Sequence, residues 1–73
     1  MTRLSPIPAR ELCRKLSKLG FELIRQKGNH AFWRHKDGRT VVVPVHKGKN
    51  IGKGLFRTIL SEIEVSFKDF EKL

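Results

Sequence analysis

The sequence predicts an α+β fold, in which two helices cover one face of a three-stranded antiparallel sheet. Amphipathic helical patterns occur near both ends of the 73-residue chain, and three strand-like runs lie between them. The dipeptide Asp37-Gly38 separates the last two runs and is a strong hairpin signal. We therefore expect the element order α-β-β-β-α, with the second face of the sheet open to a partner.

The first helix is predicted over residues 9–19. Leucines such as Leu12 and Leu16 recur at helical spacing, whereas lysines and arginines fill the other side. Pro8 suits the entry to a helix, and Gly20 suits the left-handed position that ends one. We expect this helix to pack its leucine stripe on the sheet.

The three strands are predicted over residues 21–26, 30–36 and 39–45. A turn at residues 27–29 joins the first two strands, and Pro44 suits the end of the third. Phe32 and Trp33 alternate on the second strand, so one of them must face the helices. Core filling is expected for both rings, and base stacking is the alternative for the outward one.

The C-terminal part is predicted as a loop, a second helix and a short helical tail. The loop covers residues 46–54 and is expected to be flexible, and the helix covers 55–63 with Gly54 as its cap. Ser66 is expected to cap the tail at about 66–73. The sequence contains no internal repeat or linker, so residues 1–73 are predicted to form a single domain. The same element order occurs in double-stranded RNA-binding domains.

Charge indicates the class of partner. Sixteen Lys and Arg residues against seven Asp and Glu residues give a net charge of +9. Such an excess favours polyanions, and nucleic acid is the first candidate. The lone Cys13 cannot form an internal disulfide and is expected in the core. The chain has neither a long apolar run nor a signal-peptide pattern, which predicts a cytoplasmic protein with no membrane partner.

Three histidines are the candidate catalytic residues: His30, His35 and His46. Histidine can give and take protons near neutral pH, and RNA cleavage without a metal needs a base, an acid and stabilising cations. Because the spacing resembles no metal site, no metal or other cofactor is expected. His35 is expected to be an exposed strand residue or a phosphate contact, on the face opposite His30.

The register of the hairpin decides whether two histidines can cooperate. A two-residue turn at Asp37-Gly38 pairs His30 with Val45, which leaves His46 on the other face. A three-residue turn that includes Arg39 pairs His30 directly with His46 on the same face. The sequence leaves both registers open.

The 46–54 loop alternates lysines with glycines, whose bare backbone can approach phosphate. The segment GKNIGK lacks the spacing of a P-loop, so nucleotide hydrolysis gains no support. We expect the loop to clamp an RNA backbone.

These residues resemble the HicA family, the toxin half of bacterial and archaeal toxin–antitoxin pairs. The resemblance extends over roughly residues 8–63, and its elements are Gly28-Asn29-His30, Val43-Pro44-Val45-His46, and Gly54 followed by Arg57-Thr58-Ile59-Leu60. It implies a double-stranded RNA-binding-like fold, ribonuclease activity on messenger RNA, and a HicB-type antitoxin that masks the active site. Asn29 and Leu55 stand where the family usually has serine and threonine.

The family's catalytic histidine falls on His30, with His46 as the candidate second proton carrier. The predicted RNA-binding residues are Arg25, Lys27, Asn29, Lys47, Lys49, Lys53 and Arg57. The predicted function is a metal-independent endoribonuclease toxin of a type II toxin–antitoxin system. The alternatives are a non-catalytic RNA-binding module of the same fold and an adaptor that binds an acidic protein.

Overall fold

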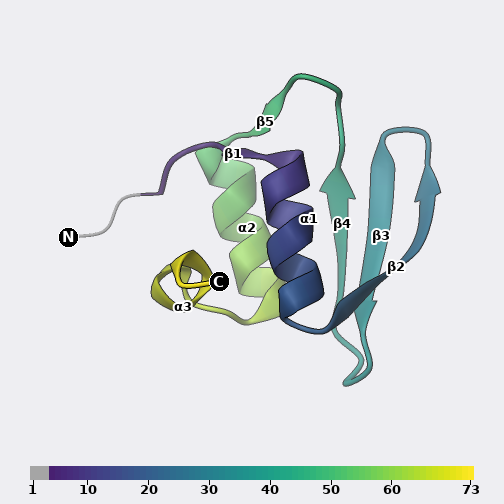
Figure 1. Ribbon diagram of the computed structural model, residues 1–73, viewed down its shortest axis with the longest axis vertical. Helices are drawn as coiled ribbons and strands as arrows, with labels where there is room; N and C mark the ends of the chain where they lie inside the picture. Colours follow the sequence, from purple (N-terminus) through teal and green to yellow (C-terminus); the bar gives the residue numbers. More distant parts are fainter. Residues whose placement is uncertain (1–3) are drawn as a thin grey trace.

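The computed structural model describes residues 4–73, so residues 1–3 of the predicted domain lie outside it. The elements are β1 (Ile7–Pro8), α1 (Ala9–Lys18), β2 (Phe21–Lys27), β3 (His30–His35), β4 (Thr40–Pro44), β5 (Asn50–Ile51), α2 (Lys53–Ile63) and α3 (Phe67–Glu71). This order confirms the predicted α-β-β-β-α arrangement and adds a two-stranded pair, β1 with β5 (Figure 1).

Helix α1 forms as predicted because its apolar residues share one side. Leu12 and Leu16 are fully buried on that side, and the exposed side is basic. Gly20 follows the helix with φ +99°, a left-handed backbone that glycine adopts without steric cost. A Cβ on Gly20 would also lie 3.1 Å from Nε2 of His35.

The main sheet has the strand order β2-β3-β4, and its strands are antiparallel. Ala31 and Trp33 of β3 and Val41 and Val43 of β4 are buried, and all four pack in one core with residues of α1 and α2. The residues between them face outward, because side chains alternate along a strand. One face therefore carries the core. The other, which we call the open face, includes His30.

Strand β2 contains a β-bulge that the sequence analysis did not anticipate. Leu23 pairs with Trp33, but Arg25 pairs with Phe32, so Ile24 is an extra residue in β2. Only Phe21 of this strand is buried, since β2 extends beyond the helices (Figure 1). The bulge moves every later residue of β2 to the opposite face.

The hairpin between β3 and β4 has a register that differs from both predicted ones. His30 pairs with Pro44, and the backbone of His35 bonds to that of Arg39 at 2.8 Å. The loop therefore consists of Lys36, Asp37 and Gly38. A type I turn followed by glycine in a left-handed conformation is a common three-residue loop, and Gly38 has φ +103°. Both predicted pairings, His30 with Val45 and His30 with His46, are wrong.

His35 is a structural residue that is only partly exposed, so its predicted position as an exposed strand residue is wrong, whereas its predicted place on the face opposite His30 is confirmed. It lies on the core face, and its ring packs edge-on against Phe21 at 5.1 Å between centroids. Its Nε2 lies 3.2 Å from the carbonyl oxygen of Leu19, and the Asp37 amide donates to its Nδ1. The ring therefore connects the end of α1 to the β3–β4 turn.

The β3–β4 turn is also held by the Asp37 carboxylate. It accepts from the Arg39 amide at 3.0 Å and from Arg39 Nε at 2.8 Å, and these groups keep the pKa of Asp37 below its usual value of 3.8. The Arg39 guanidinium also donates to the carbonyl of Ile63, at the end of α2. The turn is thus tied to α2.

The predicted loop over 46–54 is partly wrong, because half of it belongs to regular structure. Asn50 and Ile51 pair with Pro8 and Ile7, and Ile51 is buried. Helix α2 begins at Lys53, with Gly52 rather than Gly54 as its N-cap. The loop is shorter than predicted and is anchored at both ends.

The predicted C-terminal tail is α3. Ser66 Oγ accepts a hydrogen bond from the Asp69 amide at 3.2 Å, so the predicted cap is confirmed. Phe70 is buried and packs against Phe56 of α2 with ring centroids 5.4 Å apart. The tail therefore completes the core beside α2.

Two glycine substitutions should have opposite effects on stability. Gly20→Ala places a side chain in a left-handed conformation and against His35, and we expect it to lower the free energy of unfolding by about 1–2 kcal/mol. Gly54→Ala lies inside α2 with open space around it, and we expect it to raise that free energy by about 0.5–1 kcal/mol. Urea unfolding measures both, and a neutral Gly20→Ala variant would contradict the assigned conformation.

The Asp37 carboxylate should contribute stability that depends on pH. Because its pKa is lower in the folded chain, its contribution is present above about 3.8 and is lost as the pH falls through the folded-state pKa. Asp37→Asn should therefore lower the urea midpoint at neutral pH and have a smaller effect well below pH 3.8. Glu62→Gln, at an exposed position on α2, is the control. An equal loss at both pH values would show that the charge of Asp37 contributes nothing.

Candidate functional site

His30 is an exposed residue at the start of β3, on the open face of the sheet. It is flanked by Lys27 of β2 and Pro44 of β4, which are its direct cross-strand partners. Directly opposed residues have Cβ atoms about 4.5–5.5 Å apart on the same face. A cationic side chain therefore stands immediately beside the imidazole. Gly28 and Asn29 form the tight turn between Lys27 and His30. Gly28 has φ +59°, a left-handed conformation that glycine adopts without steric cost.

Arg25 is the second cation on the open face. It lies two residues before Lys27, and its guanidinium lies over the Phe32 ring at 5.1 Å from the centroid. Phe32 is therefore only partly buried and faces outward, so its predicted core role is wrong, whereas that of Trp33 is confirmed. A hollow of about 380 Å³ beside Phe32 is also lined by Arg34 and Val42.

His46 is not a neighbour of His30 in the ladder. The pairing continues one step beyond Pro44, where the Val45 amide donates to the Asn29 carbonyl at 2.6 Å. His46 comes next and begins a turn in which the Lys49 amide donates to its carbonyl at 3.1 Å. His46 is thus two residues beyond the partner of His30, which is about 6–7 Å along an extended strand. Asn29 is a predicted RNA contact, and its backbone carbonyl holds the end of β4 to the β2–β3 turn.

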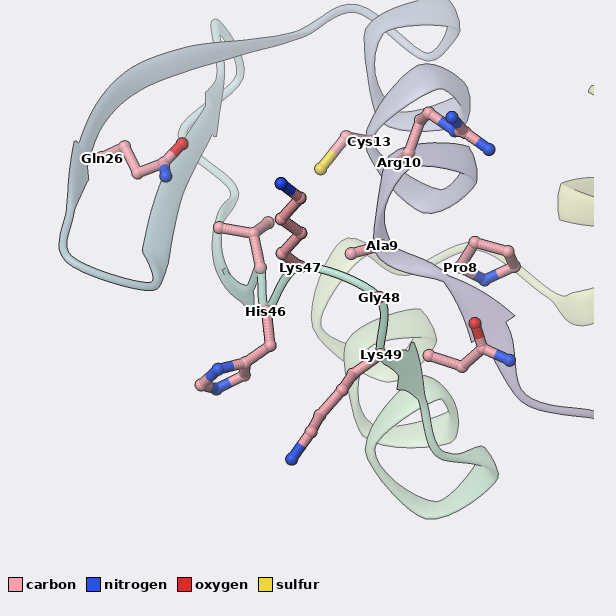
Figure 2. A pocket seen from close by; sticks show the side chains of 11 residues that line it. Pro8, Ala9, Arg10, Cys13, Gln26, His46, Lys47, Gly48 and Lys49 are labelled. Atoms are coloured by element: carbon pink, nitrogen blue, oxygen red, sulfur yellow. The ribbon is translucent and has the colours of Figure 1, made fainter.

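A second hollow lies between the start of α1 and the turn after β4, and we call it the α1–loop groove. Its volume is about 590 Å³, and its polar lining comes from Arg10, Gln26, His46, Lys47, Lys49 and Asn50. In Figure 2 the Lys47 side chain extends toward Cys13 of α1, whereas His46 and Lys49 point away from the helix. Three residues predicted to act on RNA are therefore gathered at this groove.

Lys53 and Arg57 are separated from the other predicted residues. Both are exposed on α2, one turn apart. In Figure 1, α2 lies beyond α1 as seen from β2 and β3. The structure thus distributes the predicted residues over three places: the open face, the α1–loop groove and the exposed side of α2.

Charge and chemistry differ between the open face and the groove. The open face offers an exposed imidazole next to two cations, an arrangement able to exchange protons beside a bound anion. The groove holds Cys13, and burial raises the pKa of its thiol. Within residues 4–73, no three His, Cys, Asp or Glu side chains come together as metal ligands would. None of the helices in this part of the chain is long and apolar enough to cross a membrane.

Four contributors were not predicted from the sequence: Arg34 on the open face, and Arg10, Gln26 and Asn50 at the groove. Arg34 has the same parity as His30 on β3, so strand alternation could have placed it on the open face. Arg10 of α1, Gln26 near the end of β2 and Asn50 of β5 line the groove together. Helical or strand periodicity gives no signal for that, because the groove joins residues from three separate segments.

Comparison with known proteins identifies a family. Residues 9–65 match the model of one protein family, described as the HicA toxin of bacterial toxin–antitoxin systems. A search of the curated proteins found no match. The family match covers most of the chain, including α1, the whole three-stranded sheet and α2. The chain therefore belongs to the HicA toxin family.

Proposed function

We propose that this toxin is a metal-independent endoribonuclease that cleaves messenger RNA and uses His30 as a general acid or base. The observation that carries the proposal is the position of Lys27 and Arg25 on the same face as His30. HicA toxins are known as endoribonucleases, which supports the same conclusion. A phosphate bound by these two cations would lie beside the imidazole.

The proposed chemistry uses the 2′-hydroxyl of the RNA as the nucleophile. A base removes its proton, the oxygen attacks the adjacent phosphorus, and the bond to the 5′-oxygen breaks as an acid protonates that oxygen. Lys27 and Arg25 would stabilise the negative charge that builds up on the phosphate oxygens. The products are a 2′,3′-cyclic phosphate and a free 5′-hydroxyl, so neither a metal nor a redox cofactor is required.

One histidine serves one of the two proton transfers, and a second group must serve the other. His46 is our candidate for this second group. It lies two residues after Pro44, the residue of β4 that pairs with His30, and its side chain points away from α1 (Figure 2). The imidazole would reach the opposite side of a phosphate held by Lys27. In this proposal Asn29, Lys47, Lys49, Lys53 and Arg57 are further RNA contacts.

A toxin of a toxin–antitoxin system has an antitoxin partner. We propose that a HicB-type antitoxin inhibits the toxin by covering the open face. This face is basic, and it also exposes apolar groups: Val42 is 39% exposed, and Ile24 of the bulge is 57% exposed. Such a mixture suits a protein partner that presents both acidic and apolar side chains.

Substitution of His30 should slow RNA cleavage strongly but preserve RNA binding. We expect His30→Ala to lower the rate of RNA cleavage by about 10²–10⁴-fold, the usual effect of removing a general acid or base. The assay is cleavage of a long single-stranded RNA in excess EDTA, with 2′,3′-cyclic phosphate ends identified by mass spectrometry. His46→Ala should lower the rate as well.

The outcomes separate the candidate functions. Equal cleavage by the wild type and His30→Ala would exclude His30 from the chemistry. Salt-sensitive RNA binding by both proteins without cleavage by either would favour the non-catalytic RNA-binding module. Binding to acidic proteins with no affinity for RNA would favour the adaptor.

The role of Lys27 can be tested by the salt dependence of binding. Lys27→Ala should weaken binding to a 2′-O-methyl RNA, which cannot be cleaved, and should reduce the slope of log K against log salt by about 0.7–1. The matched control is Lys68→Ala, which removes the same charge from the exposed surface of α3. Fluorescence anisotropy measures both. An equal change of slope in the control would indicate a general charge effect rather than a phosphate contact at Lys27.

A further inference from the structure

We propose that the α1–loop groove is a nucleotide-binding subsite for single-stranded RNA, adjacent to the cleavage site on the open face. The inference rests on the proposed function, because it assumes that RNA is the substrate. It adds a place for the RNA strand on the helix side of the sheet, and it adds Arg10, Gln26 and Asn50 to the residues that contact it.

The groove and the open face are joined at one end of the sheet. Gln26 pairs with Ala31 on the core side, and the next residue, Lys27, pairs with His30 on the open face. In the same way Val45, which lines the groove, directly follows Pro44, the other partner of His30. A single residue step on either strand thus leads from the His30 face into the groove. An RNA strand held at Lys27 can therefore pass over the end of β4 and enter it.

The lining of the groove suits a nucleotide. Its volume of about 590 Å³ lies within the range of small-ligand pockets, about 300–1,000 Å³. Lysine and arginine side chains supply phosphate contacts, and the amides of Gln26 and Asn50 can both donate to and accept from a base edge. The His46 ring at the mouth offers a surface on which a base can stack. Among the described residues, no acidic side chain lines this groove.

An acidic peptide is a less suitable occupant than RNA. Amphipathic peptides that dock in grooves use large apolar anchors, and acidic motifs are bound by clusters of arginines, whereas Arg10 is the one arginine within residues 4–73 that lines this groove. The apolar lining of this groove consists of small groups, namely Pro8, Ala9, Cys13 and Val45. Polar amides next to cations match the alternation of base and phosphate in a single strand better than they match an apolar side chain.

Cys13 provides a direct probe of the groove. It is the one cysteine of the chain and lines the groove wall, and Lys47 extends toward it (Figure 2). The experiment uses full-length His30→Ala protein, so that the RNA stays intact, and follows the alkylation of Cys13 by N-ethylmaleimide with mass spectrometry at mildly alkaline pH. With a short single-stranded RNA at about 100 times its Kd, about 1% of the protein is free, so we expect the alkylation rate to fall by about one to two orders of magnitude.

A matched probe controls for general coverage by RNA. Cys13→Ala combined with Lys68→Cys places the only thiol at an exposed position of α3. RNA should leave the alkylation rate of that thiol unchanged. Equal protection at both positions would overturn the proposal. So would equal protection of Cys13 by polyglutamate of matched charge, which would make the groove a general acidic-peptide site.

The failure of this inference can be distinguished from the failure of the proposed function. If anisotropy shows RNA bound at saturation while Cys13 reacts at its unprotected rate, the subsite is wrong, and cleavage by His30 is unaffected. If RNA does not bind at all, both proposals fail. If saturating RNA protects Cys13 from alkylation less in the Gln26→Ala variant, the RNA contacts the groove itself.

Discussion

The burial of a single face of the sheet is the constraint on which the rest of the structure depends. The two long helices cover Ala31, Trp33, Val41 and Val43, and these side chains form the centre of a small core. Because successive side chains on a strand point to opposite faces, burial of these four residues fixes the outward direction of all their neighbours. His30 is exposed for this reason. A one-residue shift of β3 would bury the imidazole and expose Trp33, at a large cost in apolar burial.

The bulge at Ile24 gives the open face its cations. In a regular strand that begins with buried Phe21, Arg25 and Lys27 would share the core side, because all three positions are odd. The extra residue reverses this alternation, so both cations join His30 on the exposed side. The bulge is possible because β2 is an edge strand that extends beyond the helices, where an unpaired residue such as Ile24 can remain exposed.

The β3–β4 turn decides how the two histidines relate. Gly38 closes a three-residue loop, and the hydrogen bonds of His35, Asp37 and Arg39 hold that loop to α1 and α2. The resulting register places Pro44 beside His30 and sends His46 into the following turn. His30 therefore belongs to the open face, while His46 lies at the mouth of the α1–loop groove. The end of β4 connects the two, and this is why we place the RNA across it.

The sequence by itself determined the two long helices, the three main strands, their order and the placement of His30 and His35 on opposite faces, because helical and strand periodicities are local and glycine and proline mark the ends of segments. It also determined the Ser66 cap, which depends on residues three positions apart. Only the tertiary structure decided the bulge in β2, the β3–β4 register, the pairing of β1 with β5 and the groove between α1 and the loop. Each of these depends on which of several sterically allowed pairings buries most apolar surface and satisfies the most backbone groups. That choice involves residues far apart in the chain: Ile7 with Ile51, His35 with Leu19, and Arg39 with Ile63.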